Sequence, residues 1–196
     1  HIATNACMQV FGGHGYIKES GMEQFARDNR INMIYEGTNT IQSLDLLGRK
    51  ILGNNGATLK KFGKLVGQLV EEEGVNEKMA EFINPIAMLG DQLTKFTTEI
   101  GFKGFQNPDE VGAAAVDYLR VAGHLVHGYF WARMARVALR EIAAAEKEGR
   151  QADPFYKAKL QTARFYFARL FPETVSLMRT ARSGASVLLD TDEALA

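Results

Sequence analysis

A single acidic residue lies in the sequence setting that a general base requires. Glu36 follows the apolar pair Ile34 and Tyr35, and Gly37 comes directly after it. The glycine permits a short turn, so the carboxylate can be aimed at one fixed point. Enclosure by apolar groups would make that carboxylate a stronger base, able to take a proton from a substrate. Taken alone, however, such a loop more commonly holds a solvated acid that a helix dipole favours.

The helix expected after Glu36 adds a second chemical possibility. It begins at Thr38 or Asn39. Its free backbone N–H groups and positive dipole end suit a phosphate group or the polar edge of a flavin. Asn39 and Gln42 have the spacing of a capping box, which would fix the start of this helix. The loop and the helix together predict a base beside an anion-binding helix end.

A glycine-rich segment near the start of the chain is the second candidate site. It reads Gln9-Val10-Phe11-Gly12-Gly13-His14-Gly15-Tyr16. Its glycines would let the backbone approach a ligand closely, and the Gln9 amide can both donate and accept hydrogen bonds. The segment is not a dinucleotide-binding fingerprint, because a helix rather than a strand is expected before it and the glycine spacing differs. A helix C-cap followed by a turn explains it equally well.

The elements that must position these residues are expected to be helical throughout. No segment alternates apolar and polar residues with β-branched enrichment, so the predicted fold class is all-α. Asn107-Pro108 and Asp153-Pro154 each pair an N-cap residue with proline at the first helical position. Pro85 and Pro172, inside apolar periodic stretches, are expected to kink or divide helices. The helices are expected at about residues 1–10, 21–32, 38–52, 57–73, 76–103, 109–148 and 154–188.

The first break in composition is expected to be a domain boundary. The glycine and asparagine run at residues 53–56 ends the third helix and gives predicted domains of residues 1–53 and 54–196. The chain begins at His1 with helix-like sequence and no initiator methionine, so we expect it to be a fragment of a longer protein. Small residues at high density in residues 109–148 predict close packing between helices.

Composition and charge exclude several classes of function. Lys and Arg number 23 and so do Asp and Glu, which disfavours nucleic acid as the main partner. No apolar run reaches the roughly 18–20 residues of a membrane span, and no signal peptide is recognisable. The single cysteine, Cys7, suits a reducing cytoplasm and is expected to be buried and unreactive. His124 and His127 have a spacing that metals use, but nothing nearby completes a site, so no metal is expected.

Several segments taken together resemble one family. Three segments resemble, in order and spacing, the C-terminal helical domain of acyl-CoA dehydrogenases. They are Gln9 to Tyr16, then Arg27-Asp28, then Ile34-Tyr35-Glu36-Gly37-Thr38 with Ile41-Gln42. Residues 54–190 resemble the additional helical domain of long members, including the 3-methylmercaptopropionyl-CoA dehydrogenase type. The resemblance implies the end of the family's C-terminal helical bundle, followed by a second helical-bundle extension.

The resemblance also implies a role for each candidate residue. Glu36 would be the catalytic base that removes the α-proton of an acyl-CoA, while hydride passes from the β-carbon to FAD and leaves a trans-2-enoyl-CoA. Gly37 would contact the substrate. The implied FAD-binding residues are Gln9, Val10, Phe11, Gly12, Gly13, Thr38, Asn39 and Thr40. Of these, Gln9 and Gly13 would reach the FAD of a neighbouring subunit. An electron-transferring flavoprotein would reoxidise the FAD, and the extension would support a homodimer.

Two other functions stay open. One is a helical subunit-assembly module, in which residues 54–196 form an interface and the Glu36 loop has no catalytic part. The other is a non-dehydrogenase flavin-binding relative, for which a nucleic-acid role is disfavoured by the neutral charge. The chain alone is expected to be inactive, because the resembled fold holds its flavin between helical domains and a β-domain that this sequence lacks.

Overall fold

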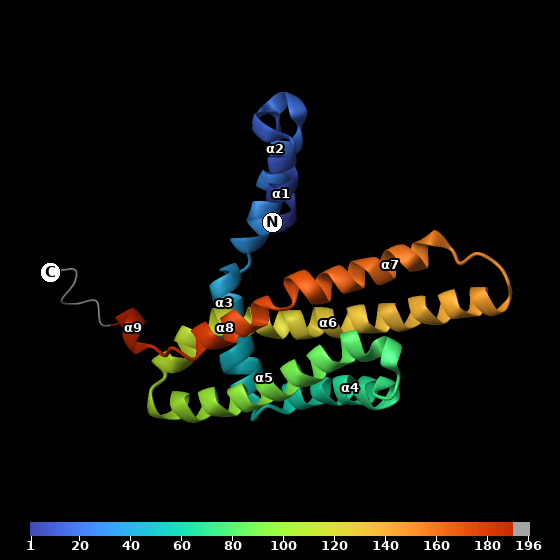
Figure 1. The fold of residues 1–196 in the computed structure, drawn as a ribbon. Helices are drawn as coiled ribbons and strands as arrows, with labels where there is room; N and C mark the ends of the chain where they lie inside the picture. The colour runs from blue at the N-terminus through green and yellow to red at the C-terminus, as the bar shows by residue number, and fades with distance from the viewer. Residues whose placement is uncertain (190–196) are drawn as a thin grey trace. The chain divides into compact units, whose positions relative to one another are not determined.

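The computed structural model describes residues 1–189, and within them every regular element is helical (Figure 1). The all-α prediction is therefore confirmed. The chain divides into two compact units, His1–Gln42 and Ser43–Ala196, the second described as far as residue 189. The division falls inside helix α3 (Thr38–Leu44). The domain boundary that the sequence places at residues 53 and 54 stays a prediction.

The first unit is built on two antiparallel helices, α1 (Ile2–Val10) and α2 (Met22–Arg30). Short 3₁₀ turns connect and extend them: η1 (Gly12–Tyr16), η2 (Lys18–Ser20) and η3 (Ile31–Met33). Gly15 lets η1 fold against the end of α1, because a Cβ there would lie 2.2 Å from the carbonyl oxygen of Met8. A residue with a side chain would not fit at this position without a shift of the backbone.

Residues 1–42 have no hydrophobic core of their own. Gly15 is the single buried residue among them. Large apolar side chains such as Val10, Phe25 and Ile2 are more than 60% exposed. Cys7 is exposed as well, so the prediction that it is buried is wrong. Because burial of apolar surface is the main favourable term in folding, this unit must gain stability from surfaces outside residues 1–42.

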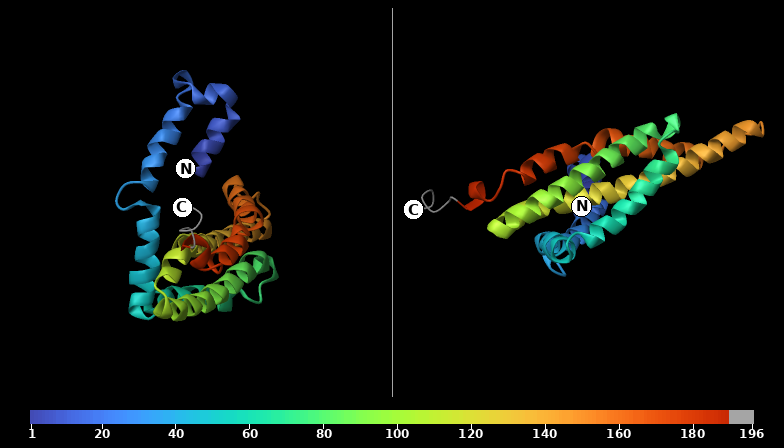
Figure 2. Two further views of the ribbon diagram at one scale, coloured as in Figure 1. Left: turned by 90° about the vertical axis from the view of Figure 1, so that its left-hand side faces the viewer. Right: turned by 90° about the horizontal axis from the view of Figure 1, so that it is seen from below.

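The second unit is a bundle organised around one long helix, α6 (Asp109–Lys147). Helix α5 (Ala80–Gln106), α7 (Pro154–Phe165) and α8 (Glu173–Ala181) pack along α6, and α4 (Ala57–Glu73) packs on α5 (Figures 1 and 2). The remaining elements are the π-helical turns η4 (Asp45–Ile51) and η7 (Tyr166–Leu170), the 3₁₀ turns η5 (Leu52–Asn54) and η6 (Glu77–Met79), and α9 (Ser186–Leu189).

Side-chain caps and prolines explain where several of these helices begin and end. The Asp153 carboxylate accepts the N–H of Phe155 at 2.8 Å, with Pro154 at the first helical position, as the sequence predicts. Asn107 caps α6 in the same way. Pro172 separates η7 from α8, which confirms it as a dividing residue. Pro85 does not divide a helix, because α5 continues through it.

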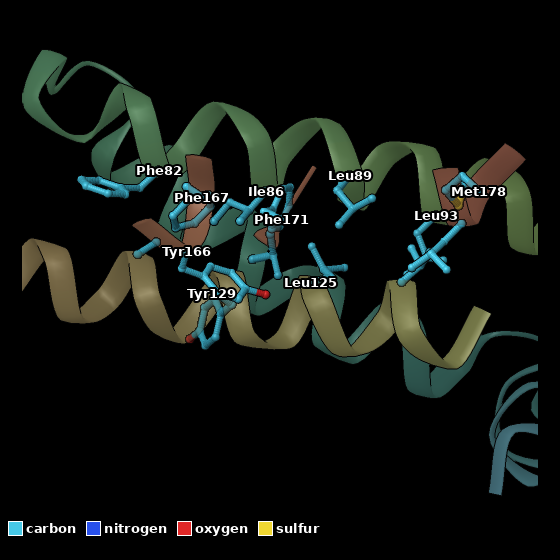
Figure 3. Close-up of a cluster of buried hydrophobic side chains, with 14 of the residues drawn as sticks. Phe82, Ile86, Leu89, Leu93, Leu125, Tyr129, Tyr166, Phe167, Phe171 and Met178 are labelled. Atoms are coloured by element: carbon cyan, nitrogen blue, oxygen red, sulfur yellow. The ribbon is translucent and has the colours of Figure 1, made fainter. Parts of the chain in front are cut away.

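Aromatic side chains from three elements fill the centre of the bundle (Figure 3). The ring of Phe82 on α5 meets Phe167 edge-on, with 5.5 Å between centroids, and Phe167 lies 5.3 Å from Phe171. Gly128 on α6 allows α5 and Phe171, the residue that follows η7, to come this close, since a Cβ there would lie 2.9 Å from Ile86 and from Phe171. Close packing at the small residues of α6 is thus confirmed at Gly128.

The polar groups inside the bundle have partners. The hydroxyls of Thr97 and Tyr118 lie 2.6 Å apart between α5 and α6. His124 lies 2.9 Å from the Tyr166 hydroxyl through Nδ1 and 3.1 Å from the Glu173 carboxylate through Nε2. Burial raises the pKa of the Tyr166 phenol well above its usual value, and the charge of Glu173 raises it further. Tyr166 therefore stays protonated, and this network joins α6 to η7 and α8.

Candidate functional site

The turn that carries Glu36 has a backbone conformation that side-chain-bearing residues rarely adopt. Glu36, Gly37 and Thr38 have successive positive φ angles of 54°, 96° and 44°. Glycine adopts this region freely, whereas a β-branched threonine there is a genuine outlier. A non-glycine residue in this region, such as Glu36 or Thr38, costs of the order of 1–3 kcal/mol, and strain of this kind concentrates at functional sites.

Two hydrogen bonds hold this turn against the helix that follows it. The side-chain amide of Gln42 donates to the carbonyl oxygen of Glu36 at 2.7 Å. The Thr38 hydroxyl accepts the N–H of Ile41 at 3.4 Å, so Thr38 acts as the cap of α3. The capping box predicted between Asn39 and Gln42 is therefore wrong. Gln42 reaches back past the helix start to Glu36 because the left-handed turn brings that carbonyl within its range.

The Glu36 carboxylate is exposed, and the apolar groups beside it cover it only in part. Ile34, Tyr35 and Ile41 are each about half exposed, at 50%, 53% and 51%. Side chains this exposed do not close a pocket over the turn. A complete apolar enclosure of Glu36 would thus need surfaces that residues 1–42 do not supply.

The glycine-rich segment forms the C-terminal cap of α1 and the following 3₁₀ turn. The N–H of Phe11 bonds to the carbonyl of Met8, and Gly12 has a φ of 60°. The candidate residues Gln9, Val10, Phe11, Gly12 and Gly13 are all exposed. A Cβ at Gly12 or Gly13 would meet no atom within 4 Å, so the backbone there is open to close approach. A ligand could therefore approach this backbone from outside the unit.

The structure places the two candidate segments at opposite ends of the α1–α2 pair. The glycine-rich segment follows α1, and α2 runs back to the turn that contains Glu36 (Figures 1 and 2). Each helix has nine residues and is about 14 Å long. The segments therefore cannot line one small pocket within a single chain. Thr38, Asn39 and Thr40 are exposed beside Glu36.

A cavity between α1 and α2 adds positive charge that the sequence did not indicate. It has a volume of about 710 Å³, and its charged lining residues include Lys18, Glu23, Arg27 and Arg30. Arg27 lines this cavity, whereas the neighbouring Asp28 accepts a hydrogen bond from Gln24 at 2.6 Å. The spacing of Arg27 and Arg30 on one helix face was the available signal.

Neither a metal centre nor a membrane-spanning helix is found in the described part of the chain. Over residues 1–189, no group of three or more His, Cys, Asp and Glu side chains is arranged to hold a metal ion. None of the described helices is both long and apolar enough to cross a membrane. His124, which the sequence raised as a possible ligand, is partly buried and bonded to Tyr166 and Glu173.

Comparison with protein families gives matches over nearly the whole chain. A family model described as "Acetyl-CoA dehydrogenase C-terminal like" matches residues 58–192. A second, described as "Acyl-CoA dehydrogenase, C-terminal domain", matches residues 1–52. The two matches cover the bundle around α6 and the unit that contains Glu36, respectively.

Comparison with individual proteins agrees with these family matches. The chain is 32% identical to the 3-methylmercaptopropionyl-CoA dehydrogenase of Ruegeria pomeroyi, over 92% of this chain and 30% of the relative. It is 27% identical to a butyryl-CoA dehydrogenase of Syntrophomonas wolfei, over 98% of this chain and 31% of the relative. A broad-specificity linear acyl-CoA dehydrogenase of Mycobacterium tuberculosis is 25% identical, over 95% of this chain and 31% of the relative. The chain thus spans less than a third of each of these relatives.

Proposed function

The chain belongs to the acyl-CoA dehydrogenase family, and from this we propose that the full-length protein containing it is an FAD-dependent acyl-CoA dehydrogenase. The proposed reaction removes hydrogen from the α- and β-carbons of an acyl-CoA thioester and leaves a trans-2-enoyl-CoA. Bound FAD would supply the hydride acceptor. Glu36 would take the α-proton on its carboxylate, and Gly37 would contact the substrate beside it.

The observation that carries this proposal is the strained turn at Glu36, Gly37 and Thr38. Three successive left-handed residues, held by Gln42, fix the backbone from which the carboxylate projects. Strain of a few kcal/mol persists only where surrounding structure maintains it, and positioning of a reacting group is a common reason. The half-exposed apolar side chains of Ile34, Tyr35 and Ile41 would support a base that works in a largely dry setting once further protein surface covers them.

The proposed FAD-binding residues fall into two groups. Thr38, Asn39 and Thr40 would hold the FAD that reacts beside Glu36. Gln9 and Gly13, with Val10, Phe11 and Gly12 between them, would reach the FAD of a neighbouring subunit. The place of this segment at the far end of the α1–α2 pair supports this division. A site shared between subunits requires an oligomer, and we propose a homodimer supported by the bundle of residues 54–196.

The remaining parts of the proposal concern the wider protein. An electron-transferring flavoprotein would reoxidise the FAD, and the single cysteine supports a cytoplasmic location. The 196-residue chain alone would be inactive, because it has no core around the Glu36 loop. The first alternative is a helical assembly module, which is supported by the self-contained core of the second unit. The second alternative is a non-dehydrogenase flavin-binding relative.

Product analysis tests this proposal. The full-length protein is incubated with straight-chain acyl-CoAs and an artificial electron acceptor, and the thioesters are then separated and identified by mass. We expect a product that has lost two hydrogens and carries a trans double bond between the α- and β-carbons. The 196-residue chain, tested in parallel, should yield none. Unchanged thioesters with the flavin-loaded full-length protein would overturn the dehydrogenase proposal and favour the non-dehydrogenase alternative.

A further inference from the structure

A groove between α6 and α7 in the second unit has features of a ligand site that the proposed reaction does not use. Its volume is about 420 Å³, within the usual range for small-molecule sites. Its lining includes Phe130, Arg133, Met134, Val137, Phe155 and Lys159. These residues define the α6–α7 groove.

The apolar surface of this groove is exposed on a unit that has a buried core of its own. Phe130 and Phe155, one from each helix, are 49% and 57% exposed. The neighbouring positions Ala132, Ala135 and Leu160 are buried in the bundle. The exposure of the two phenylalanines is therefore not a sign of missing packing beneath them, as it is in residues 1–42.

Two cationic side chains line the groove, and each lies over aromatic rings. The Arg133 guanidinium lies 5.4 Å from the ring centroid of Tyr129 and 5.9 Å from that of Phe130. The Lys159 ammonium lies 5.4 Å from Phe155 and 5.9 Å from Trp131. Such cation–π contacts hold a cation in place and leave its hydrogen-bonding edge available to an anion.

Neither cation forms an ion pair with a carboxylate over residues 1–189. Arg136, which also lines the groove, differs because its guanidinium lies 2.6 Å from Glu72 and 3.6 Å from Glu73. The charge of Arg136 is thus compensated, whereas those of Arg133 and Lys159 are not. The groove combines an apolar floor with two uncompensated positive charges, one from each helix.

This combination selects a particular chemistry of ligand. We propose that the α6–α7 groove binds a small amphipathic anion, an aliphatic chain that ends in a carboxylate. The chain would lie against Phe130, Val137 and Phe155, and the carboxylate would pair with Arg133 and Lys159. A flat aromatic anion fits less well, because the two cations already occupy positions over the rings of Phe130 and Phe155.

The single tryptophan of the chain gives a direct reporter for this site. Trp131 contacts Lys159, so its fluorescence should respond when an anion engages that ammonium. The 196-residue chain is titrated with decanoate below its micelle-forming concentration, and Trp131 emission is followed. Decyltrimethylammonium has the same chain with the opposite charge, acetate has the charge without the chain, and adenosine monophosphate is a flat aromatic anion. We expect decanoate to bind at least about tenfold more tightly than each of these three.

Charge reversal tests whether the response comes from the groove. Lys159→Glu and Arg133→Glu should each weaken decanoate binding at least about tenfold. Lys157→Glu, a change of the same kind on the same helix but outside the groove lining, should leave it unchanged. Circular dichroism melting of each variant establishes that it is folded. Equal binding of decanoate and decyltrimethylammonium, equal binding by the groove variants and the parent chain, or tighter binding of adenosine monophosphate would each overturn the proposal.

Discussion

Replacement of Glu36 by glutamine in the full-length protein is expected to lower acyl-CoA turnover about 10²–10⁴-fold while bound flavin is retained. Glutamine has nearly the shape of glutamate but cannot accept the α-proton. The turn itself should survive, because Gln42 bonds to the backbone carbonyl of residue 36 and not to its side chain. Steady-state turnover and flavin content, measured on the same preparation, check this expectation.

Two further substitutions separate loss of the base from a general disturbance of the unit. Glu36→Asp keeps a carboxylate but withdraws it by one methylene, so turnover should fall between those of the parent and Glu36→Gln. Glu19→Gln removes an exposed carboxylate elsewhere in residues 1–42 and should have no effect on turnover. Turnover within a few-fold of the parent in Glu36→Gln would exclude Glu36 as the base and favour the assembly-module alternative.

Truncation of Phe82 to alanine should lower the free energy of unfolding of the 196-residue chain by about 3–5 kcal/mol. Phe82 is fully buried on α5 and meets the Phe167 ring edge-on. Its loss removes apolar contacts and leaves a cavity that the packed aromatic cluster cannot readily close. Urea unfolding followed by circular dichroism measures the change. The slope of the free energy of unfolding against urea concentration should be the same in the variant and the parent.

Phe105 provides a matched control on the same helix. It is 92% exposed, so Phe105→Ala should change the free energy of unfolding by no more than about 0.5 kcal/mol. The cooperative transition should report the second unit, because residues 1–42 contribute no core of their own. Equal destabilisation by the two substitutions would contradict the packing around Phe82.

Local signals in the sequence were sufficient for most of the helices. Asp153 with Pro154 and Asn107 with Pro108 predict helix starts because the cap and the fixed proline φ act on neighbouring backbone groups alone. Pro85 leaves α5 undivided, because tertiary packing of the helix outweighs one missing hydrogen bond. The π-helical turns at residues 45–51 and 166–170 have no comparable local signature. They depend on packing that a linear pattern does not contain.

For the candidate site, too, the sequence indicated local features but not those that depend on packing. The types and order of residues from Gln9 to Thr40 indicated which groups could do chemistry. The left-handed conformation of Thr38 and the bond from Gln42 to Glu36 could not be predicted, because threonine by itself disfavours a positive φ. The separation of the Gln9 and Glu36 segments follows from the length and direction of α2. Exposure of Cys7 was missed because burial was inferred from residue type without a core to bury it.

Anaerobic titration of the flavin-loaded full-length protein with acyl-CoAs tests the central claim most directly. The panel runs from short to long straight chains and includes thioether-containing thioesters, and the visible absorption of the flavin is followed. Removal of the α-proton and transfer of hydride together reduce the flavin, so one or a few of these thioesters should bleach it within one equivalent. A yellow protein that no thioester bleaches would contradict the dehydrogenase account. A full-length protein that stays colourless when FAD is supplied, and so cannot be loaded for this titration, would contradict flavin binding itself.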